Sequence, residues 1–197
     1  MAATILYVRH ADKKSGEEAG PNPSLTRKGI EQAKELGRNL VANGYEVDVV
    51  RGSNLVRTTE TGVIAISETY TAADVMEPDV GVFTKRFDEW KATLPSKDVK
   101  LEEGETVAGY VKRTAGQFYS EEARRSADVI RRIAEVTPGD QTVLVAGHSP
   151  LIEVVVAELA EEDPNNIPAL KDCEGWELVF DETGFVSAKT LPWNSQQ

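Results

Sequence analysis

The chain contains two histidines, and each directly follows, or nearly follows, a short apolar segment with the composition of a buried β-strand. His10 comes after residues 4–8, and His148 comes after residues 142–146. In an open α/β sheet, ligands bind in the crevice beyond the carboxyl ends of the parallel strands. We therefore expect both imidazoles to face one crevice.

Two arginines occur where they can reach the same crevice. Arg9 immediately precedes the first histidine, and Arg57 starts a helix a few residues after a further apolar segment that ends near Val50. Guanidinium groups bind phosphate oxygens in a bidentate manner, and helix N-termini favour anions. Together with the two histidines, these arginines predict a site for a dianionic tetrahedral oxyanion such as phosphate.

This combination of side chains predicts catalysis as well as binding. A neutral imidazole can attack phosphorus while guanidinium groups neutralise the charge on the equatorial oxygens. The second imidazole can hydrogen-bond to those oxygens as a cation. Two histidines without neighbouring cysteine or carboxylate ligands make a poor zinc or two-metal site. The expected chemistry therefore uses no metal and no cofactor.

The elements that must position these residues alternate between strand and helix. Strands are expected at residues 4–8, 47–50, 75–76, 142–146, 176–180 and 185–191, and the last two are expected to form a hairpin. Helices are expected between Thr26 and Gly44, at 55–67, at 106–136 with a break near 116–120, and at 150–159. This alternation predicts an α/β fold: a three-layer sandwich with a mostly parallel central sheet, antiparallel edge strands and helices on both faces. The length of 197 residues predicts a single domain over residues 1–197.

Three of the expected helices begin with residues typical of N-caps. Thr26 precedes the first helix, and the pair Ser53 and Asn54 precedes the second. Ser149 and Pro150 suit the N-cap and the first helical position of the helix that follows His148. We expect all three caps to form.

Charge and composition exclude several classes of protein. The 22 Lys and Arg residues against 33 Asp and Glu residues give a net charge of −11, which repels nucleic acid and anionic membranes. Any anionic ligand must therefore be held by a local cluster. The single cysteine, Cys173, excludes an internal disulfide framework. No apolar stretch reaches the ~20 residues of a spanning helix, and no signal peptide is visible, so we expect a cytoplasmic protein without membrane or nucleic-acid partners.

Four motifs carry a resemblance to a known family. They are, in chain order, Leu6-Tyr-Val-Arg-His-Ala11, Leu25-Thr-Arg-Lys-Gly-Ile-Glu-Gln-Ala33, Ser53-Asn-Leu-Val-Arg57-Thr-Thr-Glu-Thr61 and Val143-Leu-Val-Ala-Gly-His148-Ser. Their order and spacing over residues 4–155 resemble the histidine phosphatase superfamily, which has the phosphoglycerate-mutase-like fold. The resemblance implies that His10 is the nucleophile that becomes phosphohistidine. It also implies that Arg9, Arg57 and His148 complete the phosphate pocket.

The first motif departs from the usual family pattern. The family usually has Arg-His-Gly, then an acidic residue, a hydroxyl residue and later an asparagine that touches phosphate. Here Ala11 follows His10, and Asp12, Lys13 and Lys14 come next. Alanine in this place is found in the small phosphohistidine-phosphatase-like branch. Because the longer insertion and extra basic residues of the true mutases are also missing, the resemblance favours a phosphatase.

Protonation of the leaving group requires a carboxylic acid within hydrogen-bond reach. In many family members this acid is a glutamate between the second and last motifs, and Phe87-Asp-Glu-Trp90 resembles that stretch. Glu89 is the first candidate, Asp88 the second, and Glu105, near the start of a helix, the third. The small branch can also work without such an acid, because a phosphoramidate leaving group needs less assistance.

The predicted function is hydrolysis of a phosphomonoester or phosphoramidate through a phosphohistidine on His10. The substrate would be a phosphorylated small molecule or a phosphoprotein. Two alternatives stay open: a mutase that uses the same phosphohistidine on a phosphoglycerate, and a non-catalytic protein that binds a phosphorylated ligand for regulation. Isomerisation without phosphate release would favour the first, and tight phosphate binding without turnover would favour the second. The sequence assigns no oligomeric state.

Overall fold

The computed structural model describes residues 2–16, 19–69, 72–77 and 101–192. In this part of the chain, one six-stranded sheet forms the centre of the fold. Its strands are β1 (Ala3–Arg9), β2 (Val49–Gly52), β3 (Asp74–Val75), β4 (Thr142–Gly147), β5 (Gly175–Asp181) and β6 (Gly184–Thr190).

The sheet is parallel except at one edge. Its strand order is β3-β2-β4-β1-β5-β6, in which β3, β2, β4 and β1 run parallel. β5 runs antiparallel to β1, and β6 runs antiparallel to β5, which forms the expected hairpin. The predicted mostly parallel sheet with antiparallel edge strands is therefore confirmed. The second strand begins at Val49, two residues later than the pattern suggested.

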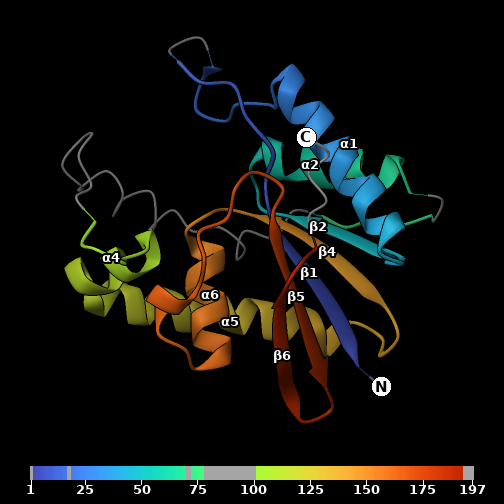
Figure 1. Ribbon diagram of the computed structural model, residues 1–197. Helices are drawn as coiled ribbons and strands as arrows, with labels where there is room; N and C mark the ends of the chain where they lie inside the picture. Colours follow the sequence, from blue (N-terminus) through green and yellow to red (C-terminus); the bar gives the residue numbers. More distant parts are fainter. Residues whose placement is uncertain (1, 17–18, 70–71, 78–100, 193–197) are drawn as a thin grey trace.

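Helices cover both faces of the sheet (Figure 1). On one face lie α1 (Arg27–Ala42) and α2 (Val56–Ser67), and on the other lie α5 (Gly116–Val136) and α6 (Leu151–Ala160). α4 (Val107–Thr114) packs against α5, and the short 3₁₀-helix η2 (Pro164–Asn166) lies against α4 and α6. The predicted three-layer α/β sandwich is confirmed. None of the helices in the described ranges is long and apolar enough to cross a membrane.

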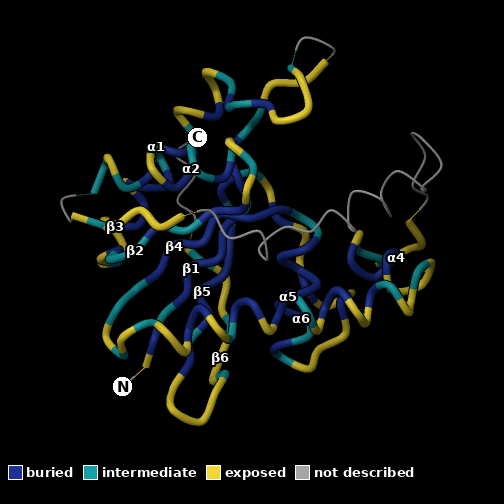
Figure 2. Tube along the Cα trace, turned by 180° about the vertical axis from the view of Figure 1, so that it is seen from behind, coloured by how far each residue is buried: buried dark blue, intermediate teal, exposed yellow. Residues whose placement is uncertain are grey.

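The central strand β1 joins the two apolar cores, and Figure 2 shows the central strands almost entirely buried. Because side chains alternate along a strand, Ile5 and Tyr7 pack under α5 and α6, whereas Leu6 and Val8 pack under α1 and α2. The parallel register pairs Arg9 with Gly147, so the carboxyl ends of β1 and β4 meet at the same edge.

The helix starts agree with the sequence in part. The Thr26 hydroxyl accepts a hydrogen bond from the Gly29 amide, as the N-cap prediction requires. The last helix begins at Leu151 without a side-chain cap, so the prediction for Ser149 is wrong. Its hydroxyl instead donates to the carboxylate of Glu153. The predicted break in the long helix is confirmed, and it falls at Ala115, between α4 and α5.

Candidate active site

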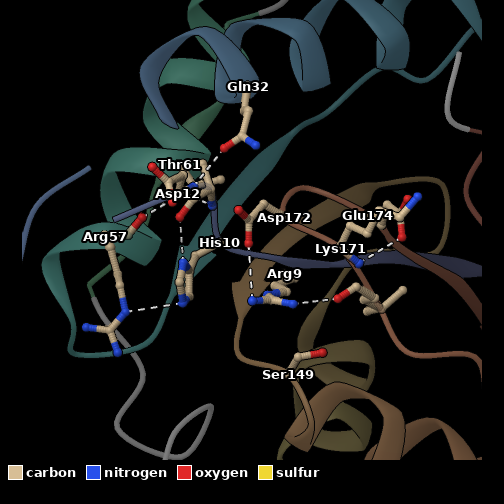
Figure 3. Close-up of polar contacts among 12 residues, drawn as sticks. Arg9, His10, Asp12, Gln32, Arg57, Thr61, Ser149, Lys171, Asp172 and Glu174 are labelled. Atoms are coloured by element: carbon tan, nitrogen blue, oxygen red, sulfur yellow. Dashed lines mark hydrogen bonds and ion pairs between the residues drawn. The ribbon is translucent and has the colours of Figure 1, made fainter. Parts of the chain in front are cut away.

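His10 follows β1 and lies at the edge where the parallel strands end, with 8% of its surface exposed. Its Nδ1 lies 2.7 Å from the carbonyl oxygen of Ala11. A carbonyl can only accept, so Nδ1 carries the proton, and in the neutral ring Nε2 keeps its lone pair. That nitrogen accepts a hydrogen bond of 3.3 Å from Nε of Arg57 (Figure 3). The nucleophilic lone pair therefore points toward a guanidinium group.

The surroundings of His10 hold its imidazole in the neutral form. Burial is the largest influence and lowers the pKa to about 4, against an ordinary 6.5. The positive charges of Arg57 and Arg9 lower it further, whereas the hydrogen bond to the Ala11 carbonyl and the charge of Asp172 act in the opposite direction. At neutral pH the ring is thus uncharged, as nucleophilic attack requires.

His148 follows β4 and lies beside His10, as predicted. The two ring centroids are 5.0 Å apart, with an angle of 64° between the ring planes. Nε2 of His148 lies 3.0 Å from the hydroxyl of Ser53, which also accepts a hydrogen bond from the Leu55 amide. The loop between β2 and α2 therefore orients the second imidazole. The predicted N-cap of α2 at Ser53 and Asn54 is wrong, because α2 begins at Val56 without a side-chain cap.

Arg9 reaches the site but is also bound to the segment before β5. Its Nη1 donates to the Leu170 carbonyl at 2.6 Å, and its Nη2 forms an ion pair of 3.2 Å with Asp172. The backbone amide of Arg9 donates to the Glu174 carbonyl, which continues the pairing of β1 with β5. About a third of the Arg9 side chain is exposed (34%).

The two residues that follow His10 in the chain, Ala11 and Asp12, have structural contacts. The amide of Ala11 donates to Thr61 of α2 at 3.0 Å, and the carboxylate of Asp12 accepts from the Thr26 hydroxyl at 2.6 Å. The Asp12 carbonyl approaches α1 so closely that a Cβ on Gly29 would lie 2.0 Å from its oxygen. Gly29, in the second motif, therefore lets α1 pack against the turn after His10.

Of the three acid candidates, Glu89 and Asp88 lie outside the described residues. Glu105 is bound by Arg113, whose Nε and Nη2 donate to its two carboxylate oxygens at 2.6 and 2.8 Å. These hydrogen bonds are the main reason that the pKa of Glu105 is lowered to about 2, and the Glu102 amide adds to the effect. A carboxyl group that is ionised throughout the neutral range has no proton to donate. This pairing argues against Glu105 as the general acid.

Two acidic residues near the site were not singled out from the sequence. Glu153 is 3% exposed and accepts hydrogen bonds from the Ser149 hydroxyl and, at 3.0 Å, from the Leu170 amide. Its burial raises its pKa. An acidic residue inside an otherwise apolar helix start was a usable signal for Glu153. Asp172 offered no such signal, because its partner Arg9 is distant in the sequence.

Solved structures of phosphatases have a similar fold. A mutant phosphoserine phosphatase from Entamoeba histolytica, in complex with phosphoserine, superposes with a TM-score of 0.66 at 17% sequence identity, covering 99% of this chain and 98% of that one. At this identity the likeness establishes the fold alone.

Curated relatives include enzymes of two kinds. The mitochondrial serine/threonine-protein phosphatase Pgam5 of Drosophila mojavensis is 28% identical over 183 residues, which cover 89% of this chain and 54% of the relative. The chain thus spans about half the length of the Pgam5 relatives it matches. A 2,3-bisphosphoglycerate-dependent phosphoglycerate mutase of Parvibaculum lavamentivorans is 25% identical over 205 residues, which cover 97% of each chain. The family model of the histidine phosphatase superfamily (branch 1) matches residues 5–190, and the chain therefore belongs to this superfamily.

Proposed function

We propose that this chain is a metal-independent phosphatase that hydrolyses a phosphomonoester or a phosphoramidate through a phosphohistidine at Nε2 of His10. The observation that carries the proposal is the pair of hydrogen bonds on the imidazole. The Ala11 carbonyl holds the proton on Nδ1, and Arg57 faces the lone pair on Nε2. A phosphoryl group that enters between Arg57 and Nε2 would meet a neutral nucleophile and a cation at once.

In the first step, Nε2 of His10 attacks phosphorus and a new N–P bond forms while the bond to the leaving group breaks. The guanidinium groups of Arg57 and Arg9 bind the equatorial oxygens, and His148 hydrogen-bonds to the transferring group. In the second step, water attacks the phosphohistidine, which releases inorganic phosphate and restores the imidazole. The Nδ1–H bond to the Ala11 carbonyl stabilises the ring while it carries the phosphoryl group.

The leaving group of an ester must also receive a proton. Glu89 is our first candidate for this general acid and Asp88 our second. For a phosphoramidate, whose nitrogen is protonated more readily, the reaction can proceed without either of them. Substrates with good and poor leaving groups therefore separate the role of the acid from that of the nucleophile.

The substrate class is proposed as a phosphorylated small molecule or a phosphoprotein. A phosphoglycerate mutase is the second candidate, because the Parvibaculum lavamentivorans relative of that name matches over 97% of both chains. A cytoplasmic location stays a prediction, and the Drosophila relatives are named as mitochondrial proteins.

Hydrolysis of an aryl phosphate in the presence of a chelator tests the proposal. The good leaving group removes the need for an acid, so the assay measures the phosphate site and the nucleophile alone. We expect phosphate release by the wild type, loss of that activity in His10→Ala, and an added phosphoryl group on the wild type in mass spectra of rapidly quenched turnover. Isomerisation of phosphoglycerate without phosphate release would establish the mutase, and phosphate binding without any turnover would establish a binding protein.

A further inference from the structure

The carboxylate of Asp172 lies beside the charged groups of the proposed phosphate site. It precedes β5, and its Oδ1 is 3.2 Å from Nη2 of Arg9, with 22% of the side chain exposed. Figure 3 shows its carboxylate joined to the Arg9 guanidinium, with His10 nearby. Burial is the main influence on the pKa of His10, and the charge of Asp172 raises this pKa by a smaller amount.

A phosphoryl group bound at Arg9 would therefore share this guanidinium with a second anion. The contacts to Leu170 and Asp172 do not use all the N–H donors of the guanidinium, so a phosphate oxygen can still bind there. Binding then brings two like charges to neighbouring positions on one cation, which costs free energy. Breaking the ion pair instead costs the attraction between Arg9 and Asp172. In both cases the carboxylate weakens phosphate binding.

We propose that Asp172 sets the affinity of the site for phosphate, because its carboxylate competes with phosphoryl oxygens for Arg9. The inference rests on the proposed function, since it requires that Arg9 bind the phosphoryl group. The consequence is weak binding of inorganic phosphate, the product of the reaction, so that free phosphate does not fill the site. Substrates that make further contacts through their leaving group gain the affinity that phosphate lacks.

The test compares Asp172→Asn with the wild type, using inorganic phosphate as a competitive inhibitor of aryl phosphate hydrolysis. The amide keeps the shape and the acceptor oxygen toward Arg9 but removes the charge. We expect the inhibition constant for phosphate to fall by about tenfold, a moderate effect because the carboxylate is partly exposed. The KM for the aryl phosphate should fall in parallel, with a much smaller change in kcat.

Glu174→Gln is the matched control. It removes the same charge two residues away, where the side chain accepts a hydrogen bond from the Lys171 amide and does not contact Arg9. We expect this variant to bind phosphate as the wild type does. In an Arg9→Gln background, the gain from Asp172→Asn should disappear, because the competition requires the guanidinium.

Phosphate binding that is unchanged or weaker in Asp172→Asn would overturn the inference, since the carboxylate would then be neutral or would orient Arg9 for binding. A gain in phosphate affinity that persists in the Arg9→Gln background would overturn the inference as well. Asp172→Ser gives a second measurement if the amide disturbs folding. If the wild type hydrolyses aryl phosphate but Asp172→Asn does not bind phosphate more tightly, the inference about Asp172 is wrong and the proposed function stands. A wild type that neither hydrolyses aryl phosphate nor binds phosphate in calorimetry contradicts the proposed function itself.

Discussion

Acidification of the protein tests directly whether His10 is the neutral nucleophile. Burial lowers its pKa to about 4, and Arg57 and Arg9 contribute in the same direction. At about pH 5.5 roughly 97% of such imidazoles are neutral, whereas a histidine with the ordinary pKa would be roughly 9% neutral. The lone pair on Nε2 should therefore remain available well below neutral pH.

Proton NMR of the imidazole rings can measure this titration without any assumption about the substrate. The chain has two histidines, so His10→Gln assigns both signals by removing one. We expect the signal that is lost in the variant to stay unchanged in the wild type from neutral pH down to about pH 5. A midpoint near 6.5 for this signal would refute the argument from burial.

The same pKa predicts how stability depends on pH. Because the folded pKa lies below the unfolded value of 6.5, the unfolded chain binds the proton first as the pH falls. The free energy of unfolding is therefore lower by about 2 kcal/mol at about pH 5, and by about 3 kcal/mol at about pH 4, than at neutral pH. His10→Gln lacks this contribution, so in urea unfolding its stability relative to the wild type should rise by these amounts on acidification. A difference between the two proteins that does not change with pH would contradict the linkage.

Three further substitutions test the packing around the site. Glu153→Ala should lower the free energy of unfolding by about 2 kcal/mol, because the buried Leu170 amide and the half-buried Ser149 hydroxyl lose their acceptor. Glu153→Gln keeps an acceptor oxygen and should cost less than about 1 kcal/mol, and equal losses in denaturant unfolding would contradict this. Gly29→Ala should lower the free energy of unfolding by about 1–3 kcal/mol, because the new Cβ clashes with the backbone of Asp12. The Cβ of Gly116→Ala has no such neighbour within 4 Å, so this control should be as stable as the wild type. Similar melting temperatures of the two variants would refute the clash. Ser53→Ala should lower kcat/KM for the aryl phosphate by about tenfold, since His148 loses its orienting partner. Full activity of this variant would show that the ring needs no such partner.

The placement of the main site residues follows from local sequence signals. His10 and His148 each follow a run of buried strand residues, and parallel pairing of β1 with β4 brings the ends of both runs to one edge. Arg57 could be placed because α2 starts directly after the neighbouring strand β2. These signals depend on periodicity and chain order alone, which a single sequence contains.

The partners that individual side chains bind in the folded protein could not be predicted in this way. Ser149 has the local sequence of an N-cap, but a buried carboxyl group on the next turn of the same helix takes its hydroxyl. The ion pair between Arg9 and Asp172 depends on the antiparallel pairing of β5 with β1, and many other acidic residues compete for any arginine in a sequence this acidic. Glu105 met the local criteria for an acid, and only the structure places Arg113 on its carboxylate.

His10 and His148 both follow buried parallel strands, and their hydrogen bonds distinguish them. In His10 the carbonyl of the next residue holds the proton on Nδ1, so Nε2 faces the proposed phosphate site with its lone pair. In His148 it is Nε2 that lies against a hydroxyl, that of Ser53, so this nitrogen is already engaged. His10 therefore presents an unprotonated nitrogen to the guanidinium group of Arg57. This hydrogen bonding favours the proposal that His10 is the nucleophile, with His148 proposed as a hydrogen-bond partner of the transferring group.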